Sequence, residues 1–456
     1  MIYSRNNFLS NALYRHTTLF EEALDKTDIG HRADDSFCRK TAQLVLVVSS
    51  SRSGSSWLSH LLAANRAFRS LPGEFDPFLL MARTPDLFRQ DSPWSDSLGI
   101  NEATPDVSKR LSMLLSTMSG HRKMRKDFWH LSDWDLYHAA IRIVWQWPED
   151  VADHEKLLRI IRLHLGQIYN ESCPAVKMVN LLQSLSNQRD GRTYNPYYYD
   201  LDYRTIKKLI PQITKPSGPP NQFGVIEEPP FVPFTPWNIS GFCSVNNSKP
   251  LILKSPSNAY RLDFLRCLFP NARITIVHVV RDPISSIAGM MRGWKSHCFY
   301  KHLLDGVFLN IPGYSNTAMS WTRYWWKFDL PPGWQDFTSQ PLAKICAFQW
   351  CSANRFILDW VEKNHKEVSY IQLNYKNLVR NPGEIITRLC DHIGVSSDIG
   401  VLNAIRINER IMASKGISDI LERTTRRLSE EEKNNTVVKE IGDLIAVVGR
   451  DYSKYK

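Results

Sequence analysis

The sequence predicts an α/β protein in which a short parallel sheet is flanked by helices. Short apolar segments rich in β-branched residues occur at 43–48, 250–254, 274–280 and 368–373, and helical patterns separate them. Strands that are buried on both faces are continuously apolar, and strands that alternate with helices form parallel sheets. The chain of 456 residues, 43% of them hydrophobic, is long enough to bury a large core around such a sheet.

The first strand–helix unit has the layout of a phosphate-binding turn. Residues 43–48 (QLVLVV) predict a strand, and a loop of serine and glycine follows it. After the loop, Trp57, Leu58 and Leu61 recur at helical spacing. A strand, a loop of small residues and a helix in this order place backbone N–H groups and a helix N-terminus around an anion.

The second half of the chain continues the alternation. Its predicted strands and helices are a strand at 250–254, a helix at 259–269, a strand at 274–280, a helix from Pro283, a helix at 342–362, a strand at 368–373 and a helix at 382–393. Pro283 suits the first turn of a helix, which needs no N–H donor there.

We divide the chain into a polar N-terminal arm at 1–40 and one domain at 41–456. Within the domain, residues 90–249 predict a large insertion of helices and loops that covers the site. It contains a core-facing helix at 155–169, whereas the proline- and aromatic-rich residues 186–249 are typical of loops.

Charge and cysteine content narrow the function classes. The net charge of +11 suits an anionic partner, which is nucleic acid, a membrane surface or a small anion. The longest basic run, 121–126, is typical of a solvated helix face, so we expect no nucleic-acid partner. The eight cysteines form no Cys-x-x-Cys pair and no metal-ligand pattern with histidine. We therefore expect reduced thiols, no metal and a cytoplasmic location.

Membrane segments are not expected either. The N-terminal residues lack the basic segment and continuous apolar core of a signal peptide. No run of about 18 apolar residues occurs in the chain, and that is the length a membrane-spanning helix needs.

Two segments carry candidate anion-binding chemistry. The first is 49–57 (SSSRSGSSW), where small residues let N–H groups turn inward and Arg52 supplies a permanent cation. It lacks the Gly-Lys-Ser/Thr ending of a nucleotide-kinase loop. The second is 279–286 (VVRDPISS), where Arg281 follows a buried strand at the edge where open α/β sheets bind ligands. Each segment also has a purely structural interpretation when it is considered alone. Residues 49–57 could be a plain serine-rich loop, and Arg281 could form an ion pair with Asp282 at a helix cap.

Together the two segments resemble the sulfotransferase family that uses 3′-phosphoadenosine 5′-phosphosulfate. The similarity continues over four further segments, which are Lys254-Ser255-Pro256, Trp350 to Arg355, Tyr375 to Pro382 and Arg427 to Glu431. It covers roughly 40–90 and 250–450. The insertion has no counterpart in it.

The resemblance implies a three-layer, P-loop-like α/β fold with a short parallel sheet. It also implies transfer of a sulfuryl group to a hydroxyl or amine of a small-molecule or glycan acceptor, without a metal or a covalent intermediate. The implied donor-binding residues are Arg52, Ser53, Gly54, Ser55, Ser56, Trp57, Arg281, Tyr375, Lys415 and Gly416. In this assignment Arg52 is also catalytic and Arg281 holds the 3′-phosphate. Trp57 stacks on adenine or is simply a core residue.

Three departures from the family pattern concern the donor site and the base. Gly289 stands where the family usually has a serine for the 3′-phosphate, so Ser285 or Ser286 substitutes for it or the contact is lost. Lys376 and Asn377 replace two acids. Pro256 occupies the position of the histidine base found in phenol- and hormone-type members, so the base lies elsewhere.

Glu74 is the first candidate for the general base, with Lys254 as a second catalytic cation. Glu74 follows the loop helix, where carbohydrate and tyrosyl members of the family place a glutamate. Its neighbours Leu71 and Phe75 predict an apolar setting that raises a carboxyl pKa. A capping or ion-paired role for Glu74 stays open. Glu227 and Glu228 in the insertion are the rival bases.

Two other functions remain open at this point. One is a phosphotransferase of the nucleotide-kinase type, against which the missing loop lysine argues. The other is a non-catalytic nucleotide-binding protein, against which the intact Arg52, Lys254 and Arg281 argue. The sequence does not determine the oligomeric state.

Overall fold

A computed structural model of the chain gives the structure of the protein. It describes residues 19, 21–23, 25–26, 34–71, 73–82, 95–120, 133–146, 154–165, 174–187, 203–213, 249–296, 299–304, 307–317, 320–398, 401 and 403.

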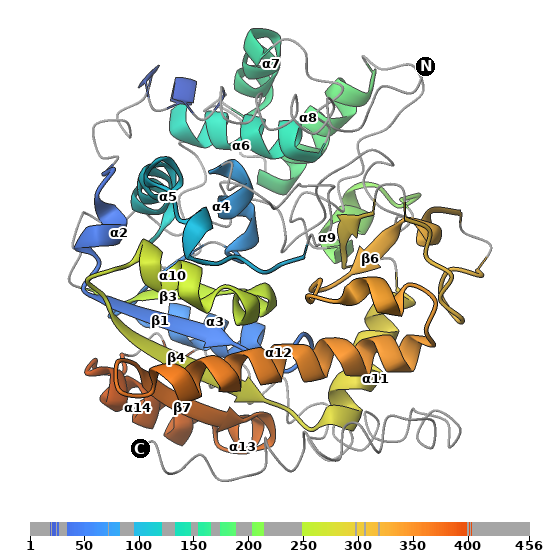
Figure 1. Ribbon diagram of the computed structural model, residues 1–456. Helices are drawn as coiled ribbons and strands as arrows, with labels where there is room; N and C mark the ends of the chain where they lie inside the picture. The colour runs from blue at the N-terminus through green and yellow to red at the C-terminus, as the bar shows by residue number, and fades with distance from the viewer. Residues whose placement is uncertain are drawn as a thin grey trace.

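The main sheet has five parallel strands in the order β2-β3-β1-β4-β7 (Figure 1). They are β2 (Arg69–Ser70), β3 (Leu251–Lys254), β1 (Gln43–Val48), β4 (Arg273–Val280) and β7 (Ser369–Asn374). β1 is the central strand, with Val47 paired to Lys254 of β3 and Val48 to His278 of β4. The carboxyl ends of three strands therefore meet where the loop after β1 begins, which is where ligands bind in open α/β sheets.

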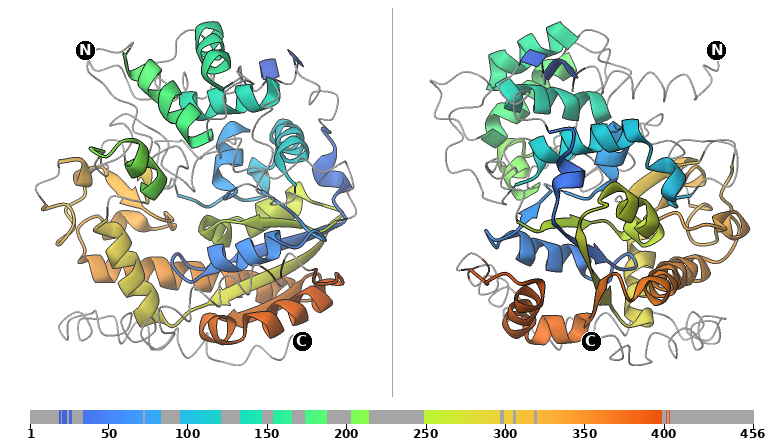
Figure 2. Two further views of the ribbon diagram at one scale, coloured as in Figure 1. Left: turned by 180° about the vertical axis from the view of Figure 1, so that it is seen from behind. Right: turned by 60° about the vertical axis from the view of Figure 1, so that its left-hand side comes forward.

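Helices cover both faces of this sheet (Figure 2). One face packs against α3 (Ser55–Ala63), α13 (Tyr375–Arg380) and α14 (Pro382–Ile393), and the other against η5 (Pro256–Tyr260), α10 (Leu262–Leu268) and α12 (Leu342–Asn364). Alternate residues of β1 supply the two cores: Leu44 and Leu46 belong to one, Val45 and Val47 to the other. This period of two confirms the predicted three-layer α/β fold.

A second, antiparallel sheet was not predicted. It pairs β5 (Tyr300–Leu303) with β6 (Trp325–Lys327), two segments of chain between α11 (Pro283–Trp294) and α12. Short 3-10 turns lie nearby at Ser320–Arg323 and Trp334–Phe337. The tryptophans at 294, 325 and 326 are fully buried, so this region belongs to the core.

The remaining described helices lie on the α10 side of the sheet. They are α2 (Phe37–Lys40), α4 (Asp76–Met81), α5 (Pro105–Met118), α6 (Asp133–Gln146), α7 (His154–Leu165), α8 (Pro174–Asn187) and α9 (Tyr203–Leu209), with a 3-10 turn at Ile100–Glu102. In Figure 1, α6, α7 and α8 stack beyond α4 and α5, away from the sheet. α7 matches the predicted core-facing helix, whereas α9 forms inside the stretch predicted as loop. The domain boundary at residue 40 stays a prediction. That residues 90–249 cover the site also stays a prediction.

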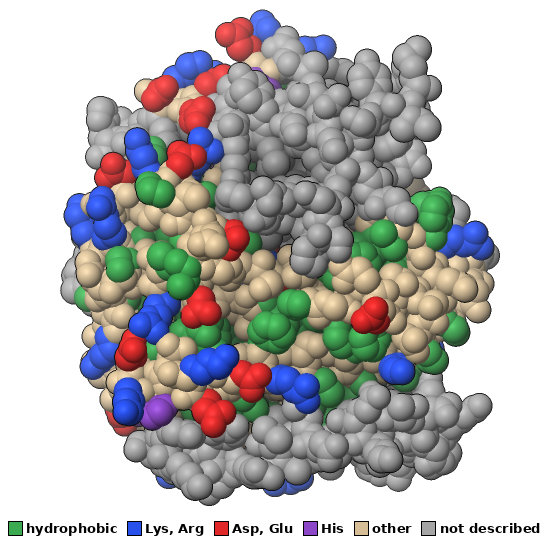
Figure 3. Space-filling view, viewed as in Figure 1, with side chains coloured by type: hydrophobic (Ala, Val, Ile, Leu, Met, Phe, Trp, Pro, Cys, Tyr) green, Lys and Arg blue, Asp and Glu red, His purple; other side chains and the backbone are tan. Residues whose placement is uncertain are grey.

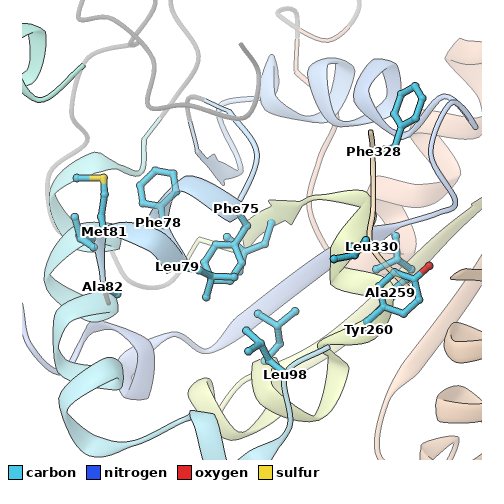
Figure 4. Close-up of a cluster of buried hydrophobic side chains, with 14 of the residues drawn as sticks. Phe75, Phe78, Leu79, Met81, Ala82, Leu98, Ala259, Tyr260, Phe328 and Leu330 are labelled. Carbon is cyan, nitrogen blue, oxygen red and sulfur yellow. The ribbon is translucent and has the colours of Figure 1, made fainter. Parts of the chain in front are cut away.

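Phe75, just before α4, and Phe78 and Leu79 within it pack into the core beside residues from other segments (Figure 4). Leu98, Tyr260 and Leu330 reach the same cluster from three distant parts of the chain. This packing fixes the segment that carries Glu74.

Among the described residues, no helix has the length and apolar character needed to span a membrane. The five described cysteines, Cys38, Cys267, Cys346, Cys351 and Cys390, form no disulfide with one another. On the described part of the face in Figure 3, Lys and Arg side chains alternate with Asp and Glu, and both surround exposed apolar groups of α12.

The segment that resembles the family's Trp-x-x-x-Asn-Arg helix has a structural role here. His278 of β4 is fully buried, and its Nε2 donates to Asn354 Oδ1 of α12 at 2.9 Å. Its Nδ1 lies 2.9 Å from the hydroxyl of Tyr370 on β7, and Asn354 Nδ2 donates to Trp350 O. These bonds join α12 to two strands. Burial lowers the pKa of His278 from 6.5 to about 4, so the imidazole is neutral near pH 7.

This buried histidine predicts a loss of stability in mild acid. Its pKa is lower in the folded state, so the unfolded chain binds more protons between pH 6.5 and about 4. The free energy of unfolding is therefore expected to fall across that window by roughly 3 kcal/mol because of this group. Denaturant unfolding at a series of pH values tests it, with His278→Gln as the comparison. An identical pH dependence in the variant would contradict the assignment.

Candidate active site

The loop between β1 and α3 is held in a tight turn. Arg52 and Gly54 have left-handed backbone, with φ of 64° and 97°. Buried hydroxyls brace the turn: Ser49 Oγ donates to Ser55 Oγ (2.8 Å), Ser50 Oγ contacts Ser53 Oγ (2.7 Å), and Ser51 Oγ donates to Asp329 Oδ1 (2.8 Å). A braced turn before a nine-residue helix presents N–H groups and the positive helix end to an anion.

Arg281 and Tyr375 close the opposite side of this loop. Arg281 Nη1 donates to Arg52 O at 3.1 Å, and its guanidinium lies 4.7 Å from the centre of the Tyr375 ring. The same ring packs on Gly54, where an added Cβ would come within 2.3 Å of Tyr375 Cδ2. Gly54 therefore serves both the turn and the close approach of the ring.

The alternative of an Arg281–Asp282 ion pair is not what the structure shows. Asp282 instead caps α11, since its Oδ1 accepts from Ser285 N at 2.8 Å, and the described residues include no ion pair between Arg281 and Asp282. Arg281 Nε is buried and has no hydrogen-bond partner among the described atoms. Arg281 also lines the cavity described below, so its guanidinium is placed to contact an anionic group of a ligand.

Gly289 lies against Arg52. A Cβ at Gly289 would come within 3.3 Å of Arg52 Cβ, so the missing side chain leaves room for the stem of the arginine. Of the two serines considered as substitutes, Ser286 is fully buried with its Oγ 3.5 Å from Ser53 Oγ, and Ser285 is 5% exposed. Their predicted contact with a 3′-phosphate stays a prediction.

Lys254 and Glu74 form a buried pair beside the start of α3. Phe75 N donates to Lys254 O at 3.1 Å, which holds the Glu74 segment against the end of β3. Lys254 Nζ donates to Glu74 Oε1 and, at 2.9 Å, to Ser56 Oγ. Lys254 is 6% exposed and Glu74 is 4% exposed. The pair thus joins the start of α3 to the segment after β2.

Burial sets the charge of Glu74. Loss of solvent is the largest influence and raises the pKa of the Glu74 carboxyl. The Lys254 ammonium acts in the opposite direction, and the Asp76 carboxylate raises the pKa further. The net direction is upward, as the apolar neighbours in the sequence predicted, and a higher pKa makes the ionised carboxylate a better proton acceptor.

A further wall of the site comes from residues that flank the two strands of the second sheet, and it was not predicted. Phe299 and Phe328 have φ of 71° and 63°, and their rings stack with centres 4.9 Å apart. The Arg52 guanidinium lies 5.2 Å from the Phe299 ring centre. Asp329 is buried, where burial raises the pKa of its carboxyl, and it accepts from Tyr260 at 2.7 Å. Nothing in the local sequence marks these residues, because their place depends on how the second sheet packs.

One cavity of about 270 Å³ joins these groups. It is lined by Ser51, Arg52, Gly54, Ser55, Ser56, Trp57, Glu74, Lys254, Pro256, Ser257, Arg281, Phe299, Lys301, Phe328, Asp329 and Tyr375. Trp57 is half-buried and also packs against the core beneath α3, so the structure is consistent with both of its predicted roles. Three distant sequence segments, around Arg52, Lys254 and Arg281, are thus brought together as the motifs predicted.

Four of the predicted or rival residues, Lys415, Gly416, Glu227 and Glu228, lie outside the described residues, as does the segment Arg427 to Glu431. Within the described part of the chain, no group of three His, Cys, Asp or Glu side chains is placed to hold a metal ion.

A model of the sulfotransferase family matches residues 45–307, which is more than half of the chain. No curated protein matches the sequence. Similar solved structures include the sulfotransferase domain of the Synechococcus PCC 7002 olefin synthase, at 17% identity and a TM-score of 0.33, covering 89% of this chain and 94% of that one. Sulfotransferase STF9 from Mycobacterium avium is 12% identical with a TM-score of 0.37, covering 97% and 84%. Sulfotransferase STF1 from Mycobacterium tuberculosis H37Rv is 12% identical with a TM-score of 0.32, covering 93% and 86%.

Proposed function

Because the chain belongs to the sulfotransferase family, we propose that it transfers a sulfuryl group from 3′-phosphoadenosine 5′-phosphosulfate to a hydroxyl or amine of a small-molecule or glycan acceptor. The observation that carries the proposal is the single cavity that holds the braced loop of Arg52, the Lys254–Glu74 pair and Arg281. It combines a helix start suited to an anion, four cations and two buried carboxyls in the lining of one cavity.

The donor-binding roles are part of the proposal, and the positions of the described groups around the cavity support them. The N–H groups of Ser53, Gly54, Ser55 and Ser56 would hold the 5′-phosphate at the start of α3. Arg281, which lines the cavity, would hold the 3′-phosphate. Trp57 and Tyr375 would flank the adenine, and Lys415-Gly416 would close over the 3′-phosphate.

The proposed step is an in-line displacement at sulfur. Glu74 accepts the proton of the acceptor hydroxyl as the acceptor oxygen bonds to sulfur. The bond between sulfur and the bridging phosphate oxygen breaks, and its electron pair stays on that oxygen. Arg52 and Lys254 stabilise the charge that develops there and on the sulfuryl oxygens. No metal takes part in this proposal, and the cytoplasm is the proposed location.

Nucleotide binding tests the donor assignment. Adenosine 3′,5′-bisphosphate at about 100 times its Kd is expected to raise the free energy of unfolding by ~2–3 kcal/mol. AMP and ATP are expected to raise it much less, because neither carries a 3′-phosphate for Arg281. Thermal unfolding with each nucleotide measures the difference. Equal stabilisation by all three would contradict the donor and indicate a generic nucleotide site.

The acceptor is best found by mass spectrometry. Libraries of hydroxyl- and amine-bearing compounds and glycans would be incubated with the donor and the protein, and products gaining SO₃ would be identified. A gain that requires both the protein and the donor supports the proposed reaction. Transfer of phosphate from ATP instead would overturn it.

A further inference from the structure

Directly behind Glu74 lies a buried cluster of four charged side chains that no motif predicted. It consists of Asp76, Asp96, Arg261 and Lys301, whose side chains are 7%, 2%, 1% and 9% exposed. Four segments of the chain contribute to it. Asp76 comes from α4, Asp96 from the loop at 95–98, Arg261 from the turn before α10, and Lys301 from β5. The charges balance, with two carboxylates and two cations.

Each cation of this cluster contacts both carboxylates. Arg261 Nη1 lies 2.9 Å from Asp76 Oδ1 and its Nη2 lies 2.9 Å from Asp96 Oδ1. Lys301 Nζ lies 2.9 Å from Asp76 Oδ1 and 3.0 Å from Asp96 Oδ2. Buried ion pairs are weak evidence of a gain in stability, because the loss of hydration offsets the attraction. Their cost suggests a role for the fixed charges next to the site.

Ser255 links this cluster to Glu74. Its Oγ donates to Asp76 Oδ2 and lies 3.5 Å from Glu74 Oε2. The other Glu74 oxygen, Oε1, already accepts from Lys254. A hydroxyl that gives its hydrogen to Asp76 has lone pairs left to accept one from a protonated Glu74. Of the two Glu74 oxygens, Oε2 is therefore the one with a neighbour that accepts a hydrogen bond.

We propose that Asp76, acting through Ser255, is the positioning residue for Glu74 and makes Oε2 the oxygen that receives the acceptor's proton. The inference rests on the proposed function, since it requires Glu74 to be the base. In the step, the proton leaves the acceptor oxygen and binds Oε2, which donates it in a hydrogen bond to Ser255 Oγ. Ser255 keeps its own hydrogen on Asp76, which stays ionised.

The cluster also fixes the electrostatic setting of Glu74. Arg261 and Lys301 keep the pKa of Asp76 well below its ordinary value against the effect of burial, so Asp76 is a permanent negative charge. Glu74 faces that charge from α4, the ammonium of Lys254 from β3, and that of Lys301 from β5. Asp96 and Arg261 lie one contact further away, and burial lowers the pKa of the adjacent His302, which stays neutral.

Ser255→Ala tests the positioning role without breaking an ion pair. It is expected to lower kcat about tenfold and to leave the affinity for adenosine 3′,5′-bisphosphate unchanged. In a Glu74→Gln background the same change is expected to have no further effect, because Ser255 acts only through Glu74. Ser255→Thr keeps the hydroxyl and is expected to restore kcat, since the extended backbone at this position, with φ of −160°, accepts a β-branched residue.

Asp76→Asn tests the electrostatic role. The readout is an infrared titration of the Glu74 carboxyl. Its signal is isolated by subtracting the spectrum of the same protein carrying Glu74→Gln. Without the Asp76 charge, Glu74 faces an excess of cations. Its titration is expected to move to lower pH by about one unit. Ser257→Ala removes a hydroxyl that donates to Asp96 at 2.6 Å rather than to Asp76 or Glu74, and is expected to leave the titration in place.

The two readouts separate this inference from the proposed function. Equal losses of kcat from Ser255→Ala with and without Glu74 would show a merely structural serine and overturn the positioning role while the reaction stands. If Asp76→Asn does not fold, the double-mutant cycle of Ser255→Ala and Glu74→Gln alone decides the inference. Absence of any donor-dependent gain of SO₃ in the wild type would overturn the proposed function and, with it, the role of Asp76. The infrared titration needs no turnover, so an unmoved Glu74 titration in a folded Asp76→Asn protein counts against the inference in either case.

Discussion

Replacement of Glu74 by glutamine is expected to lower kcat by ~10²–10⁴-fold and to leave the affinity for adenosine 3′,5′-bisphosphate nearly unchanged. Glutamine keeps the shape of the side chain and an oxygen that accepts from Lys254, but it accepts no proton at neutral pH. Steady-state kinetics with an acceptor from the mass-spectrometric screen give kcat, and calorimetry gives the nucleotide affinity.

The controls for Glu74 separate the base from a general effect of removing an acid. Glu367→Gln is the matched surface control, because Glu367 is paired with the exposed Arg266. Glu227→Gln and Glu228→Gln test the rival bases of the insertion. If either of these loses turnover while Glu74→Gln keeps it, the base belongs to the insertion and the assignment of Glu74 is wrong.

The second large effect is expected at Arg281. Arg281→Ala should weaken binding of adenosine 3′,5′-bisphosphate by roughly 30- to 1,000-fold, because a charge-assisted contact is lost and its partner is left unpaired. Binding of AMP should change little, since AMP lacks the 3′-phosphate. Titration calorimetry with both nucleotides on both proteins measures the four affinities, and thermal unfolding checks that the variant is folded.

Two variants calibrate the Arg281 result. Arg281→Lys keeps the charge but loses the planar group that stacks on Tyr375, so an intermediate loss is expected. Arg266→Ala removes a surface arginine and should leave both nucleotides unaffected. Equal losses for AMP and the bisphosphate would mean that Arg281 acts by bracing Arg52 O rather than by binding the 3′-phosphate.

Much of the fold could be predicted from the sequence, because the signals for strands and helices lie in neighbouring residues. Strands buried on both faces, such as β1 and β4, consist mostly of apolar β-branched residues and leucine, so their positions follow from the local sequence. The loop of Arg52 and the residues around Arg281 end two such strands, and parallel strands bring their carboxyl ends together. Their convergence with Lys254 in one cavity was therefore predictable from the sequence.

Other parts of the site had no signal in the sequence. Phenylalanine strongly disfavours positive φ, so nothing local predicts the backbone of Phe299 or Phe328. Such conformations persist only where surrounding structure holds them, and here Gly293 leaves the space that the Phe328 ring fills. Gly289 stands where the family usually has a serine for the 3′-phosphate, so the sequence suggested only a missing contact. The packing shows that Gly289 leaves room for the Arg52 side chain.

The sequence by itself thus determined the parallel α/β fold, the two anion-binding segments and the cation–carboxyl pair of Lys254 and Glu74 as candidates. Tertiary structure alone decided the wall of the second sheet and the charge cluster behind Glu74. The physical reason is the range of the interactions. Periodicity and turn chemistry act between residues a few positions apart, whereas Asp76 and Lys301 meet only because packing brings together segments more than two hundred residues apart.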